Sequence, residues 1–212
     1  MKKFNKVRNH VILITLISVI SGCSYAQKKD LTMSQNDLDT ATFGTGCFWC
    51  TEAIYQQLDG VKKVTSGYSG GHIKNPSYKE VCTGNTGHAE VCQVVFDKSV
   101  ISYDNLLEVF WKIHNPTTLN RQGNDIGTQY RSVIFYHSQE QKEIAEKYKE
   151  ELEKEKIWDD PIVTAIEPYS IFYPAENYHQ DYYNNNKEQP YCSIVITPKI
   201  EKFRKVFKEK LK

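Results

Sequence analysis

The 212-residue chain carries 27 lysines and arginines against 26 aspartates and glutamates, and 40% of its residues are hydrophobic. This balance excludes an intrinsically disordered chain, and the 11 glycines and 7 prolines exclude collagen-like and low-complexity sequence. Because the net charge is close to zero, the chain has no basic surplus for nucleic acid, and no nucleic-acid partner is expected. The length is that of one domain.

The N-terminal residues have the pattern of an export signal. Basic residues precede an apolar run over 11–20, which is too short to cross a bilayer, since about 20 residues are needed. The run leads into a Ser-Gly-Cys sequence that resembles the bacterial lipobox. We therefore predict a lipoprotein signal peptide over 1–22, lipidation of Cys23, a flexible tether over 23–38 and an extracytoplasmic, membrane-anchored protein. An uncleaved anchor or an ordinary secretory signal is the alternative.

Hydrophobic periodicity and turn residues predict alternating strands and helices. Strands are expected over 41–46, 61–68, 89–96, 132–136, 163–168 and, as a last fragment, 194–196. Helices are expected over 48–58, 102–115, 138–157 and 175–185. The connections over 69–88 and 117–130 are long and polar, and loops of this length inside a compact domain are usually functional.

The order of the elements over 41–168, βαββαβαβ, predicts an α/β (α+β) fold. We expect a ferredoxin-like two-layer sandwich with helices on one face of a mixed sheet. The domain is expected over 39–202, followed by a basic C-terminal tail over 203–212. The segment from Lys199 onward is expected at the surface.

One cysteine stands out by its position. If Cys23 carries lipid, five cysteines remain, an odd number that leaves at least one thiol free. Cys47 follows a predicted strand and precedes a predicted helix, between a glycine-containing turn and the aromatic pair Phe48 and Trp49. A helix N-terminus favours an anion, so we expect a lowered pKa and a reactive thiolate at Cys47.

Two other chemistries fit part of this pattern. Cys47 and Cys50 have the C-x-x-C spacing of a thioredoxin-like dithiol, although the intervening Phe-Trp pair is atypical of that site. A zinc site would need Cys47, Cys50, Cys82 and Cys92, but zinc ligands usually come as two tight pairs, and no metal is expected.

The Gly-Cys-Phe-Trp sequence at 46–49 resembles the active-site motif of the A-type peptide-methionine sulfoxide reductases. Further blocks that resemble this family follow in order at 67–71, 75–82, 84–90, 110–111, 114–117, 121–132, 175–180 and 191–192. The resemblance implies an α/β two-layer sandwich that reduces the S epimer of methionine sulfoxide, free or in proteins. It also implies no bound cofactor and a thioredoxin-type dithiol as the external reductant.

The resemblance assigns roles to individual residues. Cys47 is the nucleophile, and Glu90 is the acid, whose burial at the start of a strand is expected to raise its pKa. The family's substrate-binding positions correspond to Phe48 and Trp49, which form the pocket for the S-methyl group, and to Tyr78 and Tyr130, which hydrogen-bond the sulfoxide oxygen. Asp125 matches a carboxylate that helps to orient the substrate through water.

The resolving thiol is open between two candidates. Cys192 matches the family's usual resolving cysteine, and Cys50 lies three residues after Cys47, on the same face of a helix start. We rank Cys192 first. Cys82 matches a non-catalytic cysteine, and Cys92 is interpreted as a core residue. A disulfide oxidoreductase and an inactive binding module for oxidised peptides are the competing functions, and a monomer is expected.

Overall fold

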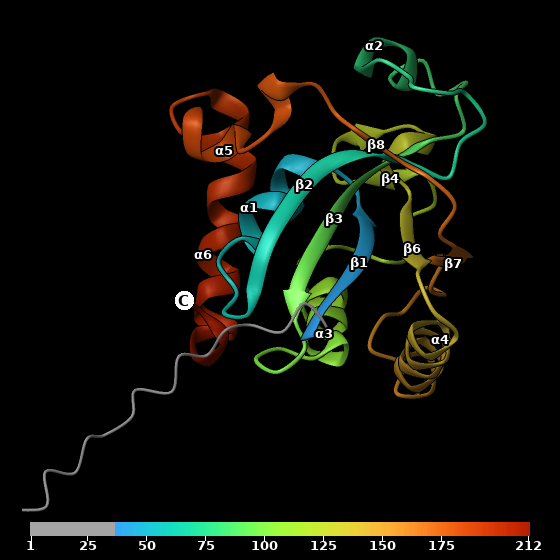
Figure 1. Ribbon diagram of the computed structural model, residues 1–212, viewed down its shortest axis with the longest axis vertical. Coiled ribbons are helices and arrows are strands. Elements are labelled where there is room, and N and C mark those ends of the chain that lie inside the picture. Colours follow the sequence, from blue (N-terminus) through green and yellow to red (C-terminus); the bar gives the residue numbers. More distant parts are fainter. Residues whose placement is uncertain (1–36) are drawn as a thin grey trace, which may run out of the picture. The chain divides into compact units, whose positions relative to one another are not determined.

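The computed structural model describes residues 37–212, whose central element is a six-stranded sheet (Figure 1). Its strands, in spatial order, are β7 (Ala165–Pro168), β6 (Ser132–Tyr136), β1 (Leu38–Thr45), β3 (Ala89–Asp97), β2 (Val61–Ser69) and β8 (Phe172–Pro174). The sheet is mixed, because β6 and β7 are parallel and the other neighbouring strands are antiparallel. A separate two-stranded ribbon contains β4 (Arg121–Gln122) and β5 (Asp125–Ile126).

Helical segments of different lengths connect the strands. The α-helices are α1 (Phe48–Tyr55), α2 (Tyr78–Val81), α3 (Tyr103–Ile113), α4 (Gln139–Lys154), α5 (Tyr182–Asn185) and α6 (Thr197–Val206). The shorter turns are η2 (Thr128–Tyr130), η3 (Asn177–His179), η4 (Cys192–Ile196) and η5 (Lys208–Lys210). Ser102 and Ser138 cap α3 and α4, each accepting a hydrogen bond from the backbone N–H three residues ahead.

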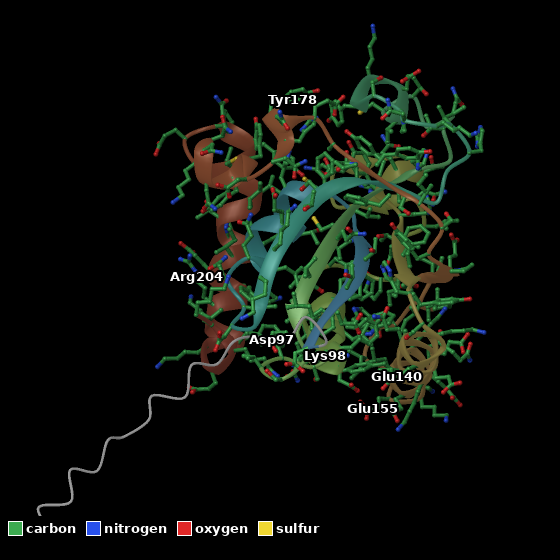
Figure 2. All side chains as sticks on the ribbon, viewed as in Figure 1. Asp97, Lys98, Glu140, Glu155, Tyr178 and Arg204 are labelled. Atoms are coloured by element: carbon green, nitrogen blue, oxygen red, sulfur yellow. The ribbon has the colours of Figure 1, made fainter. Side chains whose placement is uncertain are left out.

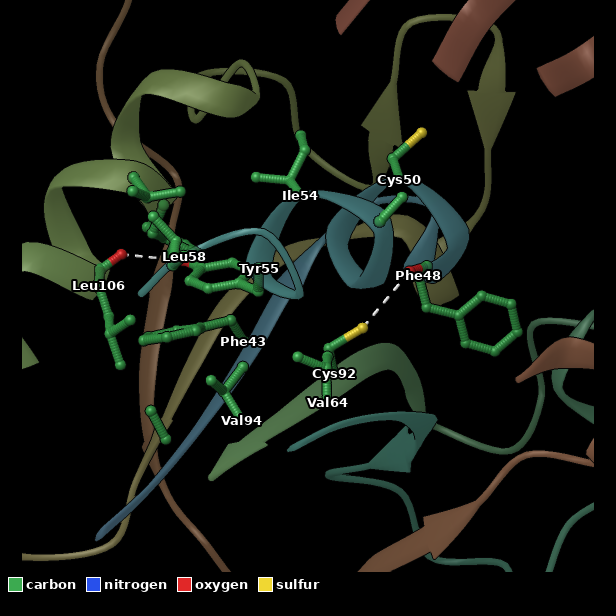
Figure 3. Packing of buried hydrophobic residues seen from close by; sticks show 14 of the residues in the cluster. Phe43, Phe48, Cys50, Ile54, Tyr55, Leu58, Val64, Cys92, Val94 and Leu106 are labelled. Carbon is green, nitrogen blue, oxygen red and sulfur yellow. Dashed lines mark hydrogen bonds between the residues drawn. The ribbon is translucent and has the colours of Figure 1, made fainter. Parts of the chain in front are cut away.

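The main core lies between the sheet and α1, α3 and α6. Side chains alternate along β3, so Cys92, Val94 and Phe96 belong to this core, whereas Ala89 and Val91 belong to a smaller cluster with Val133 and Phe135. Figure 3 shows Phe43, Tyr55 and Leu106 packed together in the main core. Charged side chains such as Glu140 on α4 and Arg204 on α6 lie at the outside (Figure 2).

Most predicted elements are confirmed, with boundaries that differ by a few residues. The two long loops also carry structure that the sequence did not indicate, because 69–88 includes α2, and 117–130 includes β4, β5 and η2. Strand β8 was missed. It has only three residues and includes a proline, and it forms by pairing with the edge of β2. The helix expected over 175–185 is divided into η3 and α5.

Two predictions at the C-terminal end are wrong. The β-branched residues 194–196 lie in the helical turn η4 that leads into α6, because a short apolar run fits a buried helix as well as a strand. The segment from Lys199 is not a surface tail. Ile200, Phe203 and Phe207 are buried against the main core, at the spacing of one helix face.

The predicted signal peptide, Cys23 and nearly all of the tether lie outside the described residues; β1 begins at Leu38, the tether's last position. Within 37–212, no helix combines the length and apolar character needed to cross a bilayer.

Candidate active site

Cys47 occupies the turn between β1 and α1. It is the N-cap of α1 and has extended backbone geometry. Gly46, just before it, has φ +94°, and a Cβ there would lie 2.5 Å from Cβ of Gln122. Glycine is therefore required at this position both for its backbone conformation and for the close approach of the 117–130 segment. The side chain of Cys47 is 6% exposed.

Glu90 lies next to Cys47, on β3. The backbone N–H of Phe48 donates a hydrogen bond to Oε2 of Glu90 at 3.2 Å. Phe48 is the first residue of α1, so this carboxyl group takes up one of the amides that a helix start leaves without a partner. The sheet thus holds the carboxyl group of Glu90 at the start of the helix that follows Cys47.

A cavity of about 190 Å³ opens at this point. Its lining residues are Cys47, Phe48, Trp49, Tyr78, Glu90, Asp125, Tyr130 and Tyr191. Seven of these eight are the catalytic and substrate-binding residues that the sequence predicted. They come from α1, α2, β3, β5 and η2, so the fold brings together segments that are far apart along the chain.

The aromatic wall of the cavity is fixed by its neighbours. Nε1 of Trp49 donates to Nδ1 of His179 at 3.1 Å, and the Trp49 ring stacks on Tyr182 with centroids 3.7 Å apart. The edge of Tyr191 meets the same indole, with ring centroids 5.8 Å apart. These contacts hold the indole beside Phe48, and aromatic rings in this arrangement suit a methyl or thioether group.

Tyr191 is the cavity residue that the sequence prediction missed. Its hydroxyl donates to Oδ2 of Asp125 at 2.6 Å. The supporting residues His179 and Tyr182 were missed as well. A signal was present for two of the three, since Tyr191 and His179 lie inside the matching blocks at 191–192 and 175–180. Their contacts with the cavity wall depend on how the C-terminal segment folds over α1.

Burial raises the pKa of both reactive groups. The pKa of Glu90 is well above its usual range, which keeps a transferable proton on the carboxyl group. The pKa of Cys47 is also raised by burial, which contradicts the lowered value expected from a helix start. Removal of the thiol from water outweighs the helix dipole, and the first helical amide donates to Glu90 rather than to the thiol.

Comparison with known proteins relates the whole of this domain to enzymes of known activity. The family model described as peptide methionine sulfoxide reductase matches residues 39–211. The chain is 55% identical to a peptide methionine sulfoxide reductase from Saccharolobus solfataricus over 82% of this chain and 98% of that protein. It is 58% identical to the enzyme of the same name from Polynucleobacter asymbioticus, over 81% and 90% of the two chains.

The solved structures agree. The crystal structure of Mxr1 from Saccharomyces cerevisiae in reduced form superposes with a TM-score of 0.68 at 38% identity, covering 75% of this chain and 91% of that one. The chain belongs to the peptide methionine sulfoxide reductase family. Its activity is the reduction of methionine sulfoxide to methionine, an oxidoreductase reaction that uses a redox-active cysteine.

Members of this family need thiols, and residues 37–212 contain five, all in the reduced form. Cys50 is 5% exposed and interacts directly with the Cys47 thiol. Cys192 is fully buried in η4, and burial raises its pKa. Cys82 is exposed, whereas Cys92 is fully buried and donates to the carbonyl oxygen of Phe48 at 3.4 Å.

The four cysteines of the zinc alternative do not converge on one point. Cys82 is exposed and Cys92 is in the core, and no cluster of three metal-binding side chains occurs among the described residues.

Proposed function

We propose that the chain reduces the S epimer of methionine sulfoxide, free or in proteins, with Cys47 as nucleophile and Glu90 as acid. The observation that carries this proposal is that both groups line one cavity of about 190 Å³ that also has an aromatic wall. The nucleophile, the proton donor and an apolar surface are the three components that attack on a methyl sulfoxide requires.

The cavity combines apolar and polar lining residues, and this combination supports selection of one epimer. Phe48 and Trp49 accommodate the S-methyl group, and Tyr78, Asp125 and Tyr130 surround the oxygen together with Glu90. A sulfoxide with its methyl group on one side and its oxygen on the other can present its remaining substituent to solvent in only one configuration. The family resemblance assigns this configuration to the S epimer.

In the first step, the sulfur of Cys47 attacks the sulfoxide sulfur. Glu90, kept protonated by burial, gives a proton to the sulfoxide oxygen, and the hydroxyls of Tyr78 and Tyr130 hydrogen-bond that oxygen. As the S–S bond to Cys47 forms, the S–O bond of the substrate breaks, and the oxygen leaves as water with one proton from Glu90 and one from the thiol. Water then attacks the sulfur of Cys47 and breaks the S–S bond, so methionine leaves, reduced by two electrons, and Cys47 becomes a sulfenic acid. The raised pKa values of Tyr78 and Tyr130 keep both hydroxyls as donors.

In the second step, a thiol condenses with this sulfenic acid to give a disulfide and water. Cys50 and Cys192 are the two resolving candidates, and the direct interaction of Cys50 with Cys47 supports a role for Cys50 in the first disulfide. A thioredoxin-type dithiol then supplies the two electrons that restore the reduced enzyme.

A comparison of epimers tests the function. Purified protein with dithiothreitol is expected to reduce a peptide that carries methionine S-sulfoxide and to leave the matched R-sulfoxide peptide unchanged. Equal rates on both peptides would contradict the epimer assignment. Insulin reduction, measured in parallel, tests the alternative of a disulfide oxidoreductase. We expect the rate of insulin reduction to be negligible, because Cys47 and Cys50 are both buried.

For location, we propose export by the signal peptide over 1–22 and anchoring through lipid on Cys23. The support is the basic, apolar and Ser-Gly-Cys pattern of the sequence. Palmitate labelling of the Cys23→Ala variant is expected to be absent, and labelling that persists would contradict lipidation of Cys23.

We also propose that the chain is a monomer, and we interpret the central strands β6, β1, β3 and β2 as a ferredoxin-like sheet.

A further inference from the structure

Cys50 has a charged neighbour that the reaction scheme does not use. Lys199, on α6, places Nζ 3.9 Å from Sγ of Cys50. Among residues 37–212, Lys199 forms no ion pair with a carboxylate, and the sulfur of Cys50 is its one side-chain hydrogen-bond partner. The ammonium group therefore directs its charge at a thiol.

The position of this pair in the fold leaves the lysine open to water and the sulfur buried. Lys199 is half-buried and borders a cavity of about 600 Å³ between α3 and α6, so water can reach its ammonium group. Cys50 is 5% exposed, on the first turn of α1. Figure 3 shows the sulfur of Cys50 on the opposite side of α1 from Cys92.

The other groups around Cys50 either lower or raise its pKa. Cys47 donates to its sulfur and lowers the pKa of Cys50, and Lys199 lowers it further. Glu90 and Asp125 act in the opposite direction, and burial opposes ionisation as well. Among these charged neighbours, Lys199 has a larger effect on the pKa of Cys50 than Asp125 or Glu90. Burial and, to a smaller extent, Cys47 raise the pKa of Cys192, and no cation is among the groups that affect it.

We propose that Lys199 is a positioning residue whose ammonium group, next to the sulfur of Cys50, makes Cys50 the thiol that resolves the Cys47 sulfenic acid first. This inference rests on the proposed function, because it needs a sulfenic acid at Cys47. It reverses the ranking that the sequence suggested for Cys192, which becomes a later participant or a core residue.

The step balances in atoms and electrons. The sulfur of Cys50 attacks the sulfur of the Cys47 sulfenic acid, an S–S bond forms, and the S–O bond breaks. The hydroxide that leaves takes up a proton, so the products are the disulfide and one water molecule. Neither gain nor loss of electrons from outside is needed, and the external dithiol later reduces the disulfide.

A single-turnover experiment tests the role of Lys199. The full-length enzyme is mixed with one equivalent of methionine S-sulfoxide without reductant, quenched at intervals, and analysed for methionine, trapped sulfenic acid and disulfide. An opposite charge within about 4–6 Å shifts a pKa by about 1–3 units. Lys199→Met is therefore expected to release methionine at the normal rate and to form disulfide about tenfold more slowly at pH 7.

Three matched variants complete the design. Lys199→Arg keeps the charge and is expected to restore most of the rate. Lys202→Met removes a lysine one turn further along α6, exposed and without a bond to Cys50, and is expected to behave as wild type. Cys192→Ser is expected to form the disulfide between Cys47 and Cys50 at the normal rate, as peptide mapping would show.

The pH profile separates charge from a merely structural effect. The rate of disulfide formation is expected to rise with the ionisation of Cys50, and Lys199→Met is expected to move the midpoint of this rise to higher pH. Disulfide formation by Lys199→Met within about twofold of wild type at pH 7, or a normal rate in Cys50→Ser, would overturn the inference. Failure of the wild type to release methionine would instead contradict the proposed function.

Discussion

Two buried thiol–carboxyl pairs lie beside or on α1, and only one of them lines the active-site cavity. Cys47 and Glu90 form the cavity pair. Cys92 and Glu52 form the rear pair, in which the thiol donates to the carbonyl oxygen of Phe48 and the carboxyl accepts from the backbone N–H of Asp181 at 2.9 Å. Figure 3 shows Cys92 on the sheet side of α1.

The two pairs resemble each other in burial and in the direction of their pKa shifts. Glu52 and Glu90 are each 2% exposed, and burial raises the pKa of all four groups. They differ in access, because Cys92 and Glu52 do not line the active-site cavity and have protein partners in place of a substrate. A perturbed pKa therefore marks a reactive pair only where a cavity lets substrate reach it.

The largest expected effect is on the two thiols. Cys47→Ser is expected to abolish release of methionine in a single turnover, because serine lacks the sulfur that attacks the sulfoxide. Cys92→Ser is expected to keep turnover within about threefold of wild type, since the hydroxyl can still donate to the Phe48 carbonyl. Circular dichroism checks folding. Normal methionine release by Cys47→Ser would contradict the assignment of the nucleophile.

The cavity carboxyl gives the next effect. Glu90→Gln keeps an oxygen that can accept from the N–H of Phe48 but removes the transferable proton. General acid catalysis contributes about 10²–10⁴-fold, so formation of the sulfenic acid is expected to slow by that factor while the fold is retained. Stopped-flow fluorescence or quenched single turnover measures this step. A loss below about threefold would mean that Glu90 is structural.

The rear carboxyl is expected to affect stability rather than rate. Burial raises the pKa of Glu52 to about 7, above its value in the unfolded chain. The folded state therefore binds this proton more tightly, and the stability it contributes is lost as pH rises from about 4.5 through about 7. In urea unfolding, the free energy of unfolding of the wild type is expected to fall between pH 5 and pH 8 relative to that of Glu52→Gln.

A surface control defines this effect. Glu140 is exposed on α4, so Glu140→Gln is expected to follow wild type at both pH values. Turnover of Glu52→Gln is expected to stay close to wild type, because Glu52 does not line the cavity. Equal stability differences at pH 5 and pH 8 would show that Glu52 does not titrate in this range.

The sequence was most informative where local pattern and chemistry coincide. The strand-turn-helix around Cys47 was predicted because its alternation, glycine and aromatic pair lie within a few residues. Seven cavity residues were predicted because they lie in sequence blocks that resemble a known family. The spacing of these residues along the chain does not by itself show that they line one cavity. Tyr191 was missed as a lining residue because its contact with Asp125 depends on two loops that meet only in the folded chain.

The sequence by itself determined the family and the order of the main elements, because these depend on residue identity and on short-range periodicity. Tertiary structure decided the rest. The folded structure raises the pKa of Cys47, although the sequence predicted a lowered pKa, because desolvation depends on what packs around the thiol. It placed the C-terminal helix in the core and brought Lys199 to Cys50, since a cation acts on a thiol through distance in space and not along the chain.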